Sequence, residues 1–111
     1  MSSAPDVGDI VILDFNPQAG HEQTGKRPAL VLSPRRFNQT TGFAWLCPIT
    51  SQEKGYPFEV KVMGSKKTRG VILTDQLKSL DWSARSLHKV DSVSTTCLNE
   101  TKTLIATILS I

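Results

Sequence analysis

Short runs of β-branched and other apolar residues, separated by turn-forming residues, occupy the chain up to about residue 90. The run DIVILDF at residues 9–15 follows Gly8 and is typical of a strand. FEVKV at 58–62 alternates apolar and polar residues, which indicates a strand with one face in water. Pro34 ends one strand, and Pro48 marks a bulge or an edge strand. The predicted strands cover residues 9–15, 28–33, 41–50, 58–62, 70–76 and 85–90.

The spacing of apolar residues changes to steps of three and four after Val93, which predicts a C-terminal helix. Ser94 is well placed to cap its N-terminus. Such a helix can cover one open side of a small sheet. We therefore predict a mostly β protein, a compact antiparallel β-barrel or sandwich with a C-terminal helix, in a single domain over residues 1–111. The apolar stripe comprises Cys97, Leu98, Thr101, Leu104, Ile105, Ile108 and Leu109.

The composition narrows the class of protein without naming a function. With 39% hydrophobic and 21% charged residues, the 111-residue chain is typical of a soluble globular protein. A formal charge of +3 is compatible with a polyanionic partner but forms no basic stripe. Cys47 and Cys97 have no metal-ligand spacing and His21 lies far from His88, so we expect no metal site and no cofactor. The N-terminus has no signal-like or membrane-spanning stretch, which predicts a cytoplasmic protein with free thiols.

The polar loop between the first two predicted strands reads AGHEQTGKRP at residues 19–28. Glycines bracket His21 and Glu22, and Arg27 directly precedes a proline that favours an extended backbone. Cleavage of RNA without a metal requires a base for the 2′-hydroxyl, an acid for the leaving 5′-oxygen and a cation for the phosphorane. These three side chains are candidates for all three tasks. A structural alternative stays open, in which Glu22 and Arg27 form a surface ion pair that closes a turn.

Motifs along almost the whole chain resemble those of the MazF/PemK family of toxin endoribonucleases, with the MazF branch nearest. In order, they are VGDIVILDFNPQAGHEQTGKRPALVLSP, FNQTTG, CPITSQEKGYPFEV, GVILTDQLKSLDW and AR. The resemblance implies an SH3-like antiparallel β-barrel with a C-terminal helix, acting as a homodimer. It also implies the toxin of a type II toxin–antitoxin system, an mRNA interferase that inhibits growth until its cognate antitoxin binds it. The implied reaction is metal-independent cleavage of single-stranded RNA at short sequences, giving 2′,3′-cyclic phosphate and 5′-hydroxyl ends.

The resemblance also implies catalytic roles for residues that match the family motifs. Glu22 and Arg27 fall on EQxGxRP, where the glutamate acts as base or RNA positioner and the arginine as acid or phosphate stabiliser. His21 matches the PemK-type loop AGHEQ, which assigns acid or base work to the histidine. Thr50 and Ser51, in the sequence PITS, match the family's Thr/Ser position, where a side-chain hydroxyl can donate a hydrogen bond to a phosphate oxygen. The alternative for these two is a hydroxyl that ties down a turn at the strand end.

Further positions are candidates for RNA binding. Leu73 stands where PemK-like proteins have an arginine, which favours the MazF-type arrangement with Arg27 as the main cation. Asp75 then either binds RNA bases or caps its strand. Single-stranded RNA is held by cations together with aromatic stacking surfaces. The candidates for RNA binding are Ser51, Lys54, Tyr56, Asp75, Gln76, Lys78 and Arg85, together with the basic loop of Lys66, Lys67 and Arg69.

A second function class shares the implied fold. A non-catalytic toxin can act by trapping a protein target such as gyrase, and fold alone does not separate the two classes. A pure protein binder has no need of the EQTGKRP loop or of Thr50. These residues therefore favour the endoribonuclease.

Overall fold

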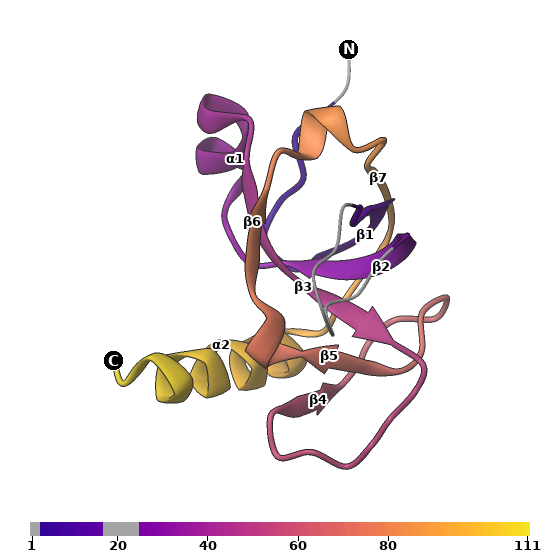
Figure 1. The fold of residues 1–111 in the computed structure, drawn as a ribbon, viewed down its shortest axis with the longest axis vertical. Coiled ribbons are helices and arrows are strands. Elements are labelled where there is room, and N and C mark those ends of the chain that lie inside the picture. The colour runs from indigo at the N-terminus through magenta and orange to yellow at the C-terminus, as the bar shows by residue number, and fades with distance from the viewer. Residues whose placement is uncertain (1–2, 17–24) are drawn as a thin grey trace.

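The computed structural model describes residues 3–16 and 25–111, and these form one seven-stranded sheet covered on one face by a helix (Figure 1). Its strand order is β4-β5-β3-β2-β1-β7, with β6 also paired to β3, and the strand pairs are antiparallel. Within the described ranges β4 and β7 do not pair, so the predicted barrel is an open, curved sheet. The strands are β1 (Asp9–Asp14), β2 (Lys26–Val31), β3 (Ala44–Thr50), β4 (Glu59–Lys61), β5 (Val71–Leu73), β6 (Lys78–Leu80) and β7 (His88–Ser92).

The C-terminal helix α2 (Thr95–Leu109) confirms the helix predicted from apolar spacing. The Ser94 hydroxyl accepts a hydrogen bond from the Cys97 backbone N–H at 3.2 Å, which is the expected N-cap. Cys97 and Thr101 are fully buried against the sheet. No helix in the described ranges is long and apolar enough to cross a membrane. The remaining helices are α1 (Arg35–Thr41) and the 3₁₀ turns η1 (Thr74–Gln76) and η2 (Trp82–Ala84).

The strands β1 and β2 bury side chains on both faces, which explains their almost continuous apolar sequence. Alternate residues belong to two clusters. Ile10 and Leu30 join the cluster under α2, whereas Val11 and Val31 join a cluster on the opposite face. The sheet therefore has a face covered by α2 and a face that carries the second cluster and, further along, the candidate site.

The short helix α1 was not predicted, because residues 35–41 (RRFNQTT) carry no amphipathic repeat. Its buried Asn38 side chain instead donates hydrogen bonds to the carbonyl oxygens of Pro5 and Ser33, at 2.8 and 2.9 Å. The predicted strand at 41–50 consequently begins only at Ala44. The predicted strand at 70–76 likewise ends at Leu73, where η1 begins.

Pro48 lies in a central strand, so its assignment to a bulge or edge strand was wrong. It is paired with Ala29 of β2. On its other side β3 pairs with β6 at residues 44–46 and with β5 at residues 49–50, which leaves a gap between them. Because the Trp45 carbonyl faces β2, strand alternation turns the Pro48 nitrogen toward this gap. A proline is tolerated there because no ladder hydrogen bond needs its N–H.

Candidate active site

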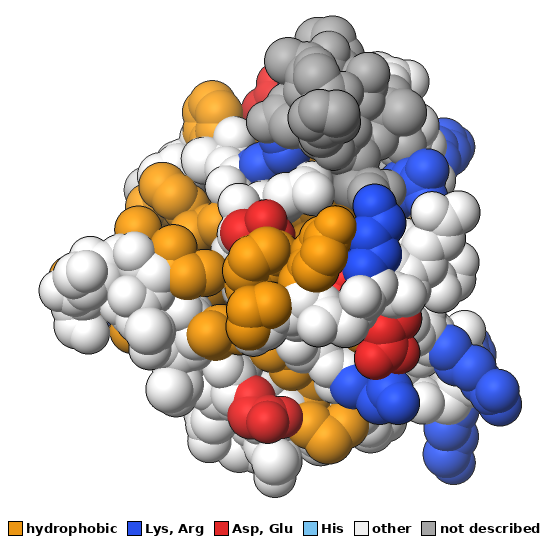
Figure 2. All heavy atoms as spheres, turned by 60° about the horizontal axis from the view of Figure 1, so that its bottom comes forward, with side chains coloured by type: hydrophobic (Ala, Val, Ile, Leu, Met, Phe, Trp, Pro, Cys, Tyr) orange, Lys and Arg blue, Asp and Glu red, His pale blue; other side chains and the backbone are white. Residues whose placement is uncertain are grey.

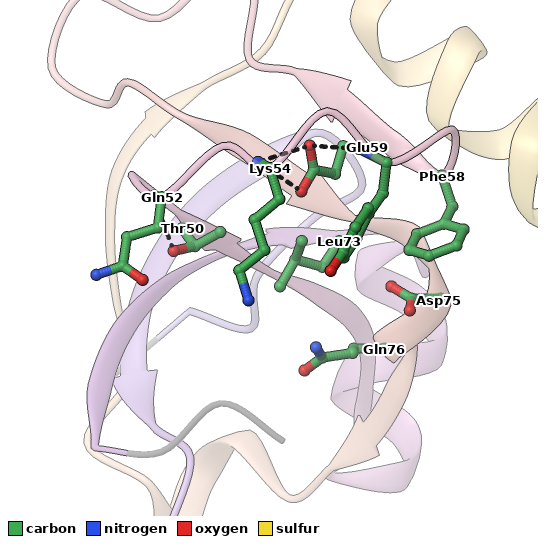
Figure 3. A pocket seen from close by; sticks show the side chains of 9 residues that line it. Thr50, Gln52, Lys54, Phe58, Glu59, Leu73, Asp75 and Gln76 are labelled. Carbon is green, nitrogen blue, oxygen red and sulfur yellow. Dashed lines mark hydrogen bonds between the residues drawn. The ribbon is translucent and has the colours of Figure 1, made fainter. Parts of the chain in front are cut away.

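Thr50 ends β3 at the rim of a pocket of about 430 Å³ (Figure 3). Thr50 is 7% exposed, and its hydroxyl accepts a hydrogen bond from the Gln52 backbone N–H at 3.1 Å. The hydroxyl thus ties a strand-end turn, as in the structural alternative, and also faces the pocket. The lining residues are Thr50, Gln52, Lys54, Tyr56, Phe58, Glu59, Leu73, Asp75 and Gln76.

Strand register explains why the pocket forms on the sheet face away from α2. Thr50 pairs with Val71, and Leu73 pairs with Glu59, so these side chains share one face. Their neighbours Ile49 and Ile72 point the other way, into the cluster under α2. The helix-covered face therefore supplies a rigid support for the face that carries the polar groups.

Arg27 lies on β2, paired with Leu13 of β1. The register of β2 with β3 pairs Ala29 with Pro48, and counting two residues further brings Arg27 level with Thr50. Residues level with each other across antiparallel strands share one face of the sheet. The predicted catalytic residues His21 and Glu22 lie outside the described residues, in the segment that precedes Gly25.

A carboxylate organises the loop that carries Lys54 and Tyr56. Glu59 accepts hydrogen bonds from the backbone N–H groups of Lys54, Gly55 and Tyr56, the shortest of them 2.9 Å from Gly55 (Figure 3). The Tyr56 ring lies 5.5 Å from the Phe58 ring, and the Lys54 ammonium lies 6.0 Å from the Tyr56 ring. The pocket thereby combines a cation with aromatic faces, which suits a single-stranded nucleic acid.

The turn η1 brings Asp75 and Gln76 to the opposite wall of the same pocket. It is tied to the loop across the pocket, because the Thr74 hydroxyl donates to the Phe58 carbonyl oxygen at 2.6 Å. Asp75 is exposed, so its carboxylate is accessible to a ligand. Sequence reasoning did not identify Thr74, whose partner Phe58 is 16 residues away, or Glu59, whose hydrogen bonds to backbone N–H groups leave no signal in the sequence.

Lys78 and Arg85, two of the predicted RNA-binding cations, lie outside the lining of this pocket. Lys78 is half-buried on β6. The Arg85 side chain donates to Asp81 at 2.6 Å and to the carbonyl oxygens of Asp14 and Asn16 at 3.0 and 2.8 Å. The hydrogen bond from Arg85 holds the pKa of the Asp81 carboxyl below its ordinary value. Arg85 thus anchors the end of β1, and its contact with RNA stays a prediction.

The two cysteines are unsuited to act as nucleophiles. Burial, with a smaller effect of the Asp75 charge, raises the pKa of the Cys47 thiol to about 12. Burial also raises the pKa of Cys97. Both therefore remain thiols at neutral pH, and the chemistry of this site falls to its oxygen and nitrogen groups.

The fold brings five predicted residues, Thr50, Lys54, Tyr56, Asp75 and Gln76, into one pocket. Ser51 lines a neighbouring hollow instead.

Comparison with known proteins identifies relatives of the chain as a whole. Residues 6–109 match the family model described as PemK-like, MazF-like toxin of type II toxin–antitoxin system. The endoribonuclease toxin MazF of Escherichia coli K12 is 49% identical over 90 residues, which cover 81% of this chain and 80% of that protein. The crystal structure of MazF from Deinococcus radiodurans superposes with a TM-score of 0.94 at 44% identity, covering 99% of this chain and 100% of that one.

A MazE–MazF structure from Deinococcus radiodurans (Form-II) superposes with a TM-score of 0.87 at 37% identity and covers 99% of both chains. The fold of the chain accordingly belongs to a known architecture. The chain is a member of the PemK-like, MazF-like family of type II toxin–antitoxin toxins.

Proposed function

We propose that this protein, an endoribonuclease toxin by its family and relatives, cleaves single-stranded mRNA at short sequences without a metal ion, until a cognate antitoxin binds it. Its place of action is then the cytoplasm, where mRNA is translated. The strand register carries the proposal. Extended by two residues, it places Arg27 of the EQTGKRP motif level with Thr50, which lines a pocket that also holds a cation and aromatic rings.

In the proposed reaction the 2′-oxygen attacks the adjacent phosphorus while the bond to the 5′-oxygen breaks. Glu22 takes the proton from the 2′-hydroxyl, and His21 is the candidate that returns one to the leaving oxygen. The Arg27 guanidinium donates two hydrogen bonds to the charged phosphorane, with the Thr50 hydroxyl as a further donor. The products are a 2′,3′-cyclic phosphate and a 5′-hydroxyl.

Flanking bases occupy the rest of the pocket. Tyr56 offers a stacking surface, and Lys54 neutralises a neighbouring phosphate. Asp75 and Gln76 offer acceptors and donors that can read base edges. The toxin that traps a protein target is not favoured, because the curated relative is an endoribonuclease and the catalytic motif is intact.

Cleavage in EDTA tests the reaction type. We expect the protein to cut a mixed-sequence single-stranded RNA equally well with and without EDTA, because its own side chains supply the base, acid and cation. The 3′ ends should be cyclic phosphates, so that they cannot be polyadenylated until the phosphate is removed. A 2′-deoxy substitution at the cut site should abolish cleavage.

Cleavage that stops in EDTA, or that leaves plain 3′-hydroxyl ends, would contradict the metal-free mechanism. A complementary strand annealed to the same RNA serves as the control, since a duplex should not enter a pocket that stacks unpaired bases.

We further propose that two chains assemble through an apolar surface at the C-terminal half of α2. Figure 2 shows hydrophobic side chains gathered on one side of the molecule. Trp45 is 43% exposed, and Ile108 and Leu109 are 47% and 55% exposed. Trp45 and Ile111 line one apolar groove together with Leu32, Leu77 and Ile105. Patches of exposed apolar side chains mark interaction sites.

The mass in solution tests this assembly. Sedimentation equilibrium should give the mass of two chains, and Trp45→Asp should shift the protein toward one chain, because a buried carboxylate without a partner opposes association. Thr107→Asp adds the same charge at an exposed position of α2 that lines a different groove from Trp45, and it serves as the control. A single-chain mass for the unaltered protein would contradict the dimer.

A further inference from the structure

The loop between β4 and β5, residues 64–70, carries a concentration of positive charge. Lys66, Lys67 and Arg69 are all exposed. The ion pairs found within the described residues join Arg35 to Asp6, Arg85 to Asp81 and Lys89 to Asp9, so they involve none of these three cations. Figure 2 shows several Lys and Arg side chains along one side of the molecule, and others beside the hydrophobic side chains. The loop therefore offers its charge to a partner outside the chain.

One carboxylate holds this loop in a defined conformation. Asp91, on β7, accepts hydrogen bonds from the Ser65 hydroxyl at 2.7 Å and from the backbone N–H groups of Lys66 and Lys67 at 2.9 and 3.2 Å. The Ser65 hydroxyl in turn accepts from the Thr68 N–H at 2.9 Å. These donors hold the pKa of Asp91 well below its ordinary value, so it is ionised at neutral pH.

Glycines at positive φ let both ends of the loop pack closely against neighbouring elements. Gly64 has φ +89°, and a Cβ there would collide with the backbone of Ser94, the N-cap of α2. Gly70 has φ +126°, and a Cβ there would collide with the carbonyl oxygen of Thr50. The backbone of the basic loop thus packs directly against the strand end that carries the candidate catalytic hydroxyl.

A second hollow, of about 370 Å³, separates the loop from the segment after Thr50. Alternate residues of segment 50–54 line the two hollows, with Thr50, Gln52 and Lys54 on the pocket and Ser51 and Glu53 on the second hollow. A polymer bound at Thr50 needs only to cross this extended segment to reach Arg69. The second hollow is lined by Ser51, Glu53, Lys61, Val62, Ser65, Thr68, Arg69 and Gly70.

We propose that loop 64–70 binds backbone phosphates of the RNA that flanks the cleavage site, and that Asp91 is the positioning residue that holds the loop for this contact. The inference rests on the proposed ribonuclease function and extends its binding surface. Rigid positioning lowers the entropy lost when flexible lysines bind. This role also explains a carboxylate that lies beside cations meant for a polyanion.

RNA binding by the Asp91→Asn variant tests the role of Asp91. A pure charge effect and a positioning effect predict changes in RNA affinity of opposite sign. If charge alone mattered, loss of an anion near RNA would strengthen binding. If Asp91 positions the loop, Kd for a 20-nucleotide RNA should rise about tenfold. The probe is an RNA that the unaltered protein cuts, with a 2′-deoxy residue at the cut site so that it binds intact. Glu53→Gln removes the same charge from the second hollow and should not weaken binding.

Two measurements separate binding at this loop from binding in the catalytic pocket: the dependence of affinity on RNA length and its dependence on salt concentration. Asp91→Asn should raise KM for the cleavable 20-nucleotide RNA while kcat stays unchanged, and it should bind a five-nucleotide RNA centred on the cut site normally. Replacing Lys66, Lys67 and Arg69 with alanine should lower the slope of log Kd against log salt by about 2, since each phosphate contact to a single strand contributes about 0.7.

The triple variant keeps the test decisive if Asp91→Asn lowers the melting temperature, since its three side chains are exposed. An unchanged salt slope for the triple variant would overturn the inference, as would unchanged or tighter binding by a folded Asp91→Asn variant. If the unaltered protein cuts no RNA, the proposed ribonuclease function is wrong, and the inference that rests on it is wrong as well. If it cuts and both variants bind as it does, only the flanking-phosphate surface fails.

Discussion

Arg27→Ala should lower kcat/KM for RNA cleavage by at least about 10²-fold while the fold stays intact, because the guanidinium is the cation that we propose to stabilise the phosphorane. The effect should appear in kcat, since the contact strengthens as charge develops in the transition state. Initial rates on a single-stranded RNA in EDTA, with melting temperature measured in parallel, provide the test.

Lys26→Ala is the matched control. Lys26 is the neighbouring residue of β2, carries the same charge and points to the opposite face by strand alternation. Its loss should change cleavage only a few-fold. Arg27→Lys keeps the charge but loses the two-pronged donor, so it should recover only part of the rate. Near-normal cleavage by Arg27→Ala would remove Arg27 from the catalytic machinery.

Glu22→Gln extends the same test to the proposed base. The amide cannot take up the proton of the 2′-hydroxyl, so the rate should fall by about 10²-fold or more. The acid limb of the pH–rate profile should disappear in this variant, because the group that titrates there is gone. A full rate with an unchanged profile would assign the proton transfer to another residue, with His21 as the next candidate.

Asn38→Ala should lower the free energy of unfolding by about 3 kcal/mol, which corresponds to a fall in melting temperature of about 10 °C or more. The side chain is fully buried and makes three hydrogen bonds. It donates to the Pro5 and Ser33 carbonyl oxygens and accepts from the Ser33 hydroxyl at 2.5 Å. Truncation leaves these buried groups without their partner. Urea unfolding followed by tryptophan fluorescence measures the effect.

Helix propensity alone predicts that Asn38→Ala raises the free energy of unfolding, since alanine favours a helix more than asparagine does. Gln39→Ala is the control, because residue 39 is exposed on the same helix and its loss should change the free energy of unfolding by less than about 0.5 kcal/mol. Equal stability of the two variants would show that the Asn38 hydrogen bonds contribute little. The rate of RNA cleavage below the melting temperature should stay unchanged in both.

Local patterns were sufficient for most of the strands and for the C-terminal helix, but not for α1 or β6. Alternating and continuous apolar runs predicted the strands around β1, β2 and β4, and the three-to-four spacing with a serine before it predicted α2 and its cap. Side-chain periodicity follows directly from backbone geometry, so it survives in the linear sequence. The EQTGKRP motif and Thr50 likewise identified the candidate chemistry from resemblance alone.

Long-range contacts determined the features that local patterns did not predict. The helix α1 depends on hydrogen bonds between Asn38 and Pro5, and the strand β3 tolerates Pro48 because it changes partners there. The level placement of Arg27 and Thr50 follows from strand register.

The roles of Glu59 and Asp91 became visible only once the loops that they hold were placed. Glu59 bonds a loop three to five residues away, whereas Asp91 bonds one about 25 residues away. Periodicity and motifs therefore established the elements and the family, since both are local properties of a chain. Which polar side chain holds which loop depends on tertiary packing, because a hydrogen bond requires two groups to meet in space and leaves no regular spacing in the sequence.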